Sequence, residues 1–91
     1  MHALAVSVQI DSGKEEDALQ ELRNNVVPRV KQAPGIVNAY WMEPGGGYGY
    51  AILLFDSEEN ANAGKQMAEN APRPDFIKLT TAQVMEVIES V

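Results

Sequence analysis

The sequence predicts an α+β domain in which two helices cover one face of a four-stranded antiparallel sheet. Three observations lead to this fold class. The chain has 91 residues, which is enough for one domain. Its apolar residues recur with a strand period in some segments and a helix period in others. Glycine and proline divide these segments into the order strand, helix, strand, strand, helix, strand. That order is the ferredoxin-like arrangement, so we expect a single domain over residues 1–91.

The first two elements follow from apolar periodicity. From His2 to Ile10, bulky aliphatic side chains alternate with small or polar ones, which predicts a strand. Ser12 and Glu15 have the spacing of a capping box, so we expect a helix of about 18 residues to begin there. Its apolar face comprises Leu19, Leu22, Val26 and Val30. Pro28 lacks a backbone N–H and predicts a kink or a loosened last turn.

The central part of the chain predicts a hairpin. Pro34 and Gly35 end the first helix, and residues 36–43 then form a strand rich in β-branched and aromatic side chains. Residues 44–47, Pro-Gly-Gly-Gly, predict a turn into a second strand over residues 48–55. These two strands are therefore expected to pair antiparallel.

The second helix is predicted from its cap and from a stripe of small residues. Asp56 or Ser57 caps it, and two glutamates follow in its first turn. Small side chains would let this helix lie close to the sheet; the stripe comprises Ala61, Gly64, Met67 and Ala68. Prolines at positions 72 and 74 end the helix. We expect the last strand at about residues 80–89.

Both faces of the predicted sheet are apolar. Within residues 36–43, alternation places Ile36, Tyr40 and Met42 on one face and Val37, Ala39 and Trp41 on the other. Within residues 48–55 it separates two further apolar sets, which are Tyr48, Tyr50, Ile52 and Leu54 on one face and Ala51, Leu53 and Phe55 on the other. Two helices can cover only one of these faces, and a large exposed apolar patch is unusual on a monomer. We therefore expect a homodimer that forms through the uncovered sheet face.

Composition excludes several classes of protein. The net charge of −6 argues against a nucleic-acid partner, because nucleic-acid-binding proteins gather lysine and arginine on one face. No window reaches the roughly 20 apolar residues of a membrane span, and the N-terminus lacks the basic region of a secretory signal. One histidine and no cysteine provide no metal site. A cytoplasmic protein is the expectation.

Three segments resemble a known family. They are IDSGKEE from Ile10, VVPRVKQAPGIVNAYW from Val26, and YAILLFDSEENANA from Tyr50. They are similar to the antibiotic biosynthesis monooxygenase family of dimeric α+β barrel proteins, over most of Met1 to Met67. The resemblance implies a homodimer whose sheets form a barrel, with a pocket between sheet and helices in each chain. Members include cofactor-free monooxygenases of aromatic polyketides or quinols, and haem-degrading enzymes.

The haem-degrading branch of that family differs from this chain at three positions. That branch pairs an asparagine on the first strand with a tryptophan on the third and a histidine on the second helix. Here the first strand carries Ser7 and Gln9, the single tryptophan is Trp41 on the second strand, and the second helix contains no histidine. We therefore expect no haem, and no other cofactor.

Aromatic side chains on the hairpin are candidates for a substrate pocket. Tyr40, Trp41 and Tyr48 would form flat walls for a hydroxyarene. The same residues would equally serve as core and dimer interface. Since Asn38 and Tyr40 alternate with Trp41, they cannot all line one pocket, and one set is expected at the interface.

Polar candidates on the same strands are Asn38 and Tyr50, which we predict as catalytic groups that hold the anion of the substrate. Asn38 would equally bond a neighbouring strand or water. His2 is the one side chain whose charge ordinarily changes near neutral pH, so it is a candidate general base in the pocket, although a surface position at the N-terminus explains it as well.

These observations lead to a functional hypothesis with alternatives. The first is a small cofactor-independent monooxygenase-like enzyme that acts on an aromatic or quinonoid metabolite. The alternatives are a non-catalytic dimeric barrel that binds a small apolar ligand, and an isomerase or cyclase on the same fold. The absence of a matched catalytic residue favours the non-catalytic barrel, and the isomerase or cyclase differs from the monooxygenase only in its pocket chemistry.

Overall fold

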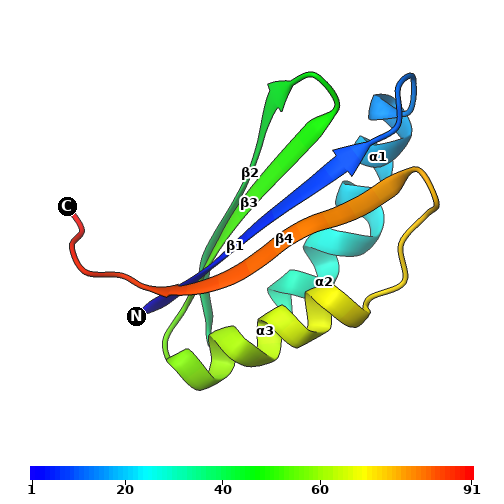
Figure 1. Ribbon diagram of the computed structural model, residues 1–91. Helices are drawn as coiled ribbons and strands as arrows, with labels where there is room; N and C mark the ends of the chain where they lie inside the picture. The colour runs from blue at the N-terminus through cyan, green and yellow to red at the C-terminus, as the bar shows by residue number, and fades with distance from the viewer.

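The computed structural model describes the whole chain, residues 1–91, and confirms the predicted fold class (Figure 1). The strands are β1 (His2–Ile10), β2 (Ile36–Gly45), β3 (Tyr48–Phe55) and β4 (Ile77–Glu86). The helices are α1 (Glu15–Glu21), the π-helical turn η1 (Leu22–Val26), α2 (Val27–Lys31) and α3 (Glu58–Asn70). No helix has the length and apolar character needed to cross a bilayer.

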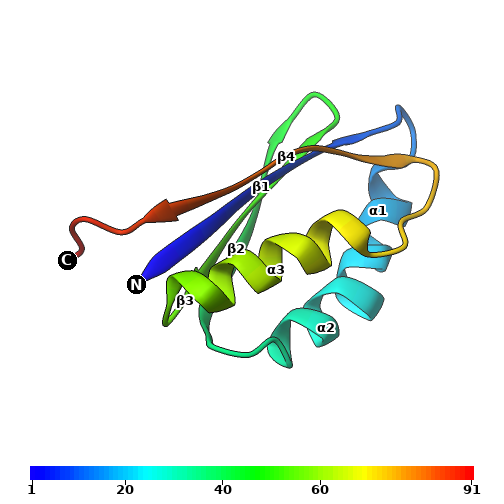
Figure 2. The same cartoon turned by 60° about the horizontal axis from the view of Figure 1, so that its bottom comes forward.

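The four strands form one sheet in the order β2-β3-β1-β4, and every neighbouring pair is antiparallel. All helices lie on the same side of this sheet (Figure 2). The register places Val6 of β1 opposite Ala51 of β3, which in turn lies opposite Trp41 of β2. These three residues therefore share the helix-covered face, whereas Tyr48 and Tyr50 are exposed and alternate with the buried Ala51.

The sheet has two distinct ends. At the hairpin end, β1 finishes beside the β2–β3 turn, and Ile10 N–H donates to the Gly47 carbonyl at 2.7 Å. At the opposite end, His2 is paired with Phe55. The buried core cluster lies on the covered face and extends toward this opposite end; its members are Leu4, Ala33, Ala51, Leu53, Phe55 and Ala61.

Part of the predicted small-residue stripe of α3 packs on the sheet, whereas Met67 of that stripe is exposed. Ala61 and Gly64 are buried. A Cβ atom at Gly64 would lie 2.6 Å from Cζ of Phe55, so only glycine permits this approach. Ser57 caps α3, because its hydroxyl accepts a hydrogen bond from the Asn60 N–H at 3.1 Å.

The first helical segment departs from the predicted continuous helix. The backbone widens into the π-helical turn η1 before Pro28, and the Val27 N–H donates to the Leu22 carbonyl, five residues back. Pro28 lies in the first turn of α2, where its missing N–H is least costly. The loosened turn therefore precedes the proline, because Pro28 offers no hydrogen to the carbonyl of Asn24.

The predicted cap of this segment is wrong. The N-cap residue of α1 is Lys14, with no side-chain cap, and Ser12 makes no bond to the helix. Gly13 has φ +83°, a left-handed conformation that turns the chain between Ser12 and the first helical turn. Of the two residues in the predicted capping box, only Glu15 forms a hydrogen bond nearby, and its carboxylate accepts from the Gly13 N–H.

Three strand predictions also need correction. Pro44 and Gly45, predicted as part of the turn, still belong to β2. The β2 register shifts between Ile36 and Asn38, so Ile36 packs against the core and Val37 is exposed, the reverse of simple alternation. The last strand begins and ends about three residues earlier than predicted. Its limits follow from pairing with β1, since Ile77 pairs with Ile10 and Glu86 with His2.

Candidate functional site

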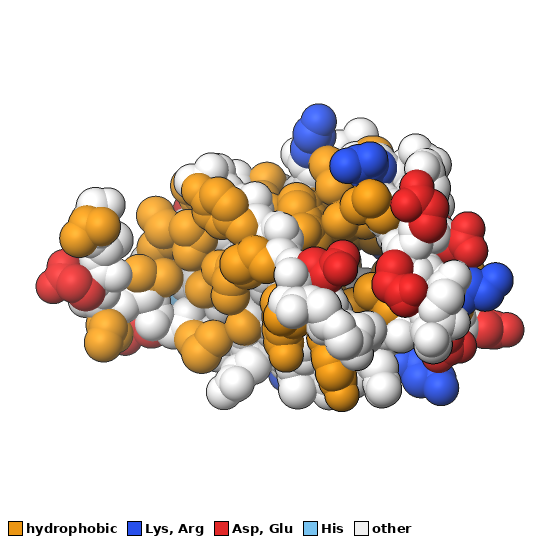
Figure 3. Space-filling model, turned by 90° about the horizontal axis from the view of Figure 1, so that it is seen from above, with side chains coloured by type: hydrophobic (Ala, Val, Ile, Leu, Met, Phe, Trp, Pro, Cys, Tyr) orange, Lys and Arg blue, Asp and Glu red, His pale blue; other side chains and the backbone are white.

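A hollow lies between the helices and the covered face of the sheet, at the hairpin end. We call it the outer cavity. It has a volume of about 290 Å³, and 16 of its 23 lining residues are hydrophobic, so its walls are apolar. Figure 3 looks down on this end, where acidic side chains border a hollow with apolar walls.

Small residues create this space. Gly49 and Ala51 face it from β3, and Ala18, Ala68 and Ala71 from the helical side. The side chains of these five residues are too short to bridge the gap between the layers. A second space of about 110 Å³, the inner hollow, continues toward the core. Six residues line both spaces: Val6, Val26, Arg29, Trp41, Ala51 and Ala68.

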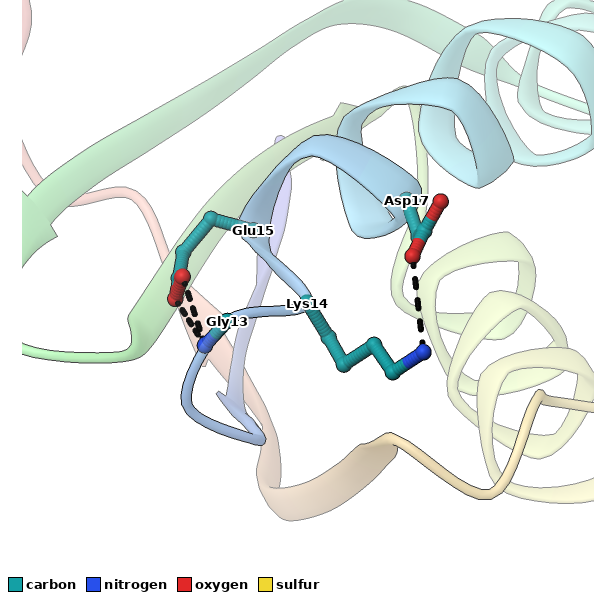
Figure 4. Close-up of polar contacts among 4 residues, drawn as sticks. All are labelled: Gly13, Lys14, Glu15 and Asp17. Atoms are coloured by element: carbon teal, nitrogen blue, oxygen red, sulfur yellow. Dashed lines mark hydrogen bonds and ion pairs between the residues drawn. The ribbon is translucent and has the colours of Figure 1, made fainter.

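The acidic residues of the outer cavity have local partners or lie at its edge. Both carboxylate oxygens of Glu15 accept from the Gly13 N–H, at 3.0 and 3.2 Å (Figure 4). Oε1 of Glu21 accepts from the Asn25 amide at 2.7 Å. Glu43, near the end of β2, is exposed.

The two arginines of the outer cavity differ in their contacts. Nη1 of Arg73 donates to the Ala68 carbonyl at 2.6 Å, and this side chain is exposed. Arg29 is partly buried on α2 and forms neither a side-chain hydrogen bond nor an ion pair; the only ion pairs of the chain are His2–Glu58 and Lys14–Asp17. Arg29 thus has a guanidinium group free to meet a ligand.

The structure brings three of the six sequence-predicted site residues to the outer cavity. Trp41 lines both spaces. Tyr48 and Tyr50 belong to the lining at the hairpin end, although alternation along β3 places them on the uncovered side of the sheet. Trp41 is therefore the aromatic wall that faces the helices.

The other three predicted residues lie elsewhere. Asn38 and Tyr40 are on the uncovered face, opposite Leu54 and Ile52 of β3. His2 lies at the opposite end of β1, with Nε2 at 3.8 Å from a carboxylate oxygen of Glu58 and with a buried Nδ1 that has no partner. None of the three lines the outer cavity.

Sequence reasoning missed Arg29 and Glu21. For Arg29 a signal was available, because it falls three residues after Val26 and next to Val30 on the predicted apolar face of the first helix. A charged residue within an apolar helical stripe indicates a side chain directed toward the covered interior.

The uncovered sheet face carries exposed apolar side chains. Tyr40 is 57% exposed and Met85 42% exposed, and Met42, Tyr48 and Tyr50 are similar. The face also holds one polar cluster, in which the hydroxyls of Thr80 and Thr81 each lie 2.6 Å from that of Ser7, at the β1–β4 register shift. Nothing within one chain covers this surface.

Comparison with known proteins gives matches in structure only. No family model matches the chain, and no curated protein matches it. Among solved structures, the haem degrader MhuD from Mycobacterium tuberculosis, with two haems in its active site, is 17% identical. It has a TM-score of 0.69, with 100% of this chain and 99% of that chain covered.

Two further structures have the same fold. A dimeric ferredoxin-like protein from an uncultured marine organism is 12% identical, with a TM-score of 0.69 and coverage of 100% and 98%. A candidate antibiotic biosynthesis monooxygenase from Chloroflexus aurantiacus is 17% identical, with a TM-score of 0.65 and coverage of 99% and 95%.

The residues of this chain do not fit a histidine-ligated or thiolate-ligated haem. Neither the outer cavity nor the inner hollow is lined by histidine or cysteine, and the one histidine is at the other end of β1. The similarity to the haem degrader thus extends to the backbone and not to this donor set. The chain has the fold that antibiotic biosynthesis monooxygenase-like proteins share with other dimeric α+β barrel proteins, as its sequence predicted.

Proposed function

We propose that the outer cavity binds a small aromatic or quinonoid molecule and that the protein oxidises it as a cofactor-independent monooxygenase. The observation that carries the proposal is the apolar cavity of about 290 Å³ with Trp41 in its wall. This volume is close to the lower limit of about 300 Å³ for small-molecule sites, so it suits a ligand of a few rings.

The charged lining supports chemistry on an ionisable arene. Glu21 is a partly buried carboxylate within the lining, and it is placed to accept a proton from a phenol or an activated methylene group. Arg29 would stabilise the resulting anion. Tyr50, at the hairpin end, is the sequence-predicted group that stays in this proposal as a second donor to the anion.

The reaction balances without an added reductant. With an anthrone, the ring methylene loses two hydrogens and gains a carbonyl oxygen from O₂. The second oxygen atom leaves as water with those two hydrogens. The substrate supplies all four electrons that reduce O₂, while the protein binds the substrate, removes a proton and stabilises the anion.

The proposal includes a homodimer formed through the uncovered sheet face. Only 8 of 91 residues are buried within one chain, so the core of a single chain is small, and the exposed tyrosines and methionines of this face provide further apolar area to bury. The similar marine protein is described as dimeric. Asn38 would enter the site only through such a dimer, because it lies on this face.

Oxygen uptake tests the catalytic proposal. We expect uptake with at least one member of a panel of anthrones and hydroquinones, and at least a tenfold lower rate in Ala68→Leu, which fills the wall shared by both spaces. Ala63→Leu is the matched control, because Ala63 is exposed on the same helix and should leave the rate unchanged. Uptake that is equal in both variants would contradict the proposal.

The second candidate function is ligand binding without turnover. It is favoured by the hydrogen bonds of the two glutamates, because Glu15 and Glu21 already accept from the Gly13 N–H and the Asn25 amide. Calorimetric binding of panel members with no oxygen uptake would establish this alternative in place of the enzyme.

A further inference from the structure

We infer that Arg29 makes the cavity selective for an aromatic acid, whose carboxylate pairs with the guanidinium group while its ring lies against Trp41. The inference rests on the proposed function, because it assumes an aromatic ligand in the outer cavity, and it adds the group that this ligand must carry. No part of it depends on the dimer.

The position of Arg29 is the first argument. It lies on α2 and lines both the outer cavity and the inner hollow, as does Trp41. Eleven of the thirteen residues that line the inner hollow are hydrophobic, and the other two are Arg29 and Gly64. Arg29 is therefore the only charged group on the apolar side of the site.

The missing counter-ion is the second argument. The chain has 13 acidic and 7 basic residues, so it contains more than enough carboxylates to pair with every arginine. Three glutamates line the outer cavity, yet none pairs with Arg29. Glu15 and Glu21 instead accept hydrogen bonds from Gly13 and Asn25.

The guanidinium group of Arg29 has no protein acceptor in the structure. The residue as a whole is partly buried, but its guanidinium nitrogens stay in contact with solvent, and its five N–H donors are open to a ligand. A carboxylate would accept two parallel hydrogen bonds from it, which is the geometry that arginine favours over lysine. Ligand binding would thus satisfy donors that the chain leaves open.

The charge distribution also fixes the orientation of such a ligand. Glutamates line the outer cavity, so they would repel a ligand carboxylate placed near them. The inner hollow has no acidic lining residue, so a ligand carboxylate that pairs with Arg29 there meets no such repulsion. We therefore place the acid group inward and the remaining ring substituents toward the glutamates. Arg73 is less suited to this role because it is exposed and already bonded to the Ala68 carbonyl.

Calorimetric titration with two ligands tests the inference. The probes are 1-hydroxy-2-naphthoate and 1-naphthol, which share a ring system and differ in the carboxylate. The wild-type protein should bind the acid at least tenfold more tightly. Arg29→Met should remove this preference, so that the acid binds no more tightly than 1-naphthol. Arg23→Met is the matched control, since Arg23 is exposed and lines neither space.

The outcomes separate this inference from the proposed function. If 1-naphthol binds and the acid binds no better, the aromatic cavity stands and the role of Arg29 is wrong. Equal affinities of the acid for wild type and Arg29→Met would overturn it as well. If neither probe binds the wild-type protein, both proposals fail. The wild-type comparison needs no variant, so the test holds even if Arg29→Met fails to fold.

Discussion

The two halves of β3 differ in what their side chains do on the same face of the sheet. Toward the opposite end, Leu53 and Phe55 are buried and fill the space beneath α3. Toward the hairpin end, Gly49 and Ala51 occupy the equivalent inward positions and leave the outer cavity open. One strand thus supports a packed core at one end and a binding site at the other.

Side-chain volume is the physical origin of this difference. Where a large residue faces the helices, the opposing helix contributes glycine or alanine, as Gly64 does against Phe55. At the hairpin end both layers contribute small residues, with Ala51 on the sheet and Ala68 on α3, so no side chain bridges the gap. Protein interiors are otherwise close-packed, so a space of this size points to function.

The largest expected effect is at the packed end. Phe55→Ala should lower the free energy of unfolding by about 3–5 kcal/mol, because it removes a fully buried ring and leaves a void. Urea denaturation followed by circular dichroism measures this change. A loss below about 1 kcal/mol would mean that the two ends are packed alike.

A second prediction compares the two faces of the sheet. Ile52 lies centrally on the uncovered face, between Ala5 and Tyr40 on the neighbouring strands. Ile52→Lys should weaken the proposed dimer at least a hundredfold, equivalent to about 2.8 kcal/mol, because it places a charge in an apolar interface. Analytical ultracentrifugation measures the dissociation constant.

Gln66→Lys is the control for that experiment, since Gln66 is exposed on α3 and points away from the sheet face in question. Its dimer affinity should match that of the wild-type protein. A wild-type chain that stays monomeric at micromolar concentration would refute the interface.

A smaller effect is expected at Gly64. Gly64→Ala should reduce the free energy of unfolding by about 1–2 kcal/mol, because the clash of the new Cβ with the Phe55 ring outweighs the gain in helix propensity of about 1 kcal/mol. Asn62→Ala, at an exposed position of the same helix, should instead be neutral or stabilising. Comparison of the two denaturation midpoints separates packing from propensity.

The smallest effect on stability is expected in the hollow end. Ala68→Leu should change the free energy of unfolding by less than about 1 kcal/mol, because the cavity has room for the larger side chain. The same variant should lose ligand affinity at least tenfold in calorimetry. A loss of stability comparable to that of Phe55→Ala would show that no free space exists beside Ala68.

The sequence was sufficient for most of the architecture because turns and periods are local signals. The limits of β3 were predicted as observed, since glycines precede Tyr48 and Asp-Ser follows Phe55. The last strand was misplaced because apolar residues continue through Val87 and Ile88, and only pairing with β1 defines where it ends. The reversal of Ile36 and Val37 likewise depends on a register shift between strands.

The candidate site was harder to predict because a cavity arises where side chains are absent. Alanines at positions 18, 51 and 68 look like ordinary core residues until the layer spacing is known. Trp41 was predicted for the pocket and lines it, whereas Asn38 and His2 were selected by chemical type and lie outside it. The catalytic role of Asn38 and the general-base role of His2 stay predictions.

Backbone amide chemical shifts during titration with 1-hydroxy-2-naphthoate test the central claim, that the hairpin end is hollow to receive a ligand while the opposite end is core. We predict the largest shift changes at Gly49, Ala51 and Ala68, and little change at Leu4 and Phe55. Changes spread evenly over both ends, or concentrated on the uncovered face around Tyr40, would contradict the account.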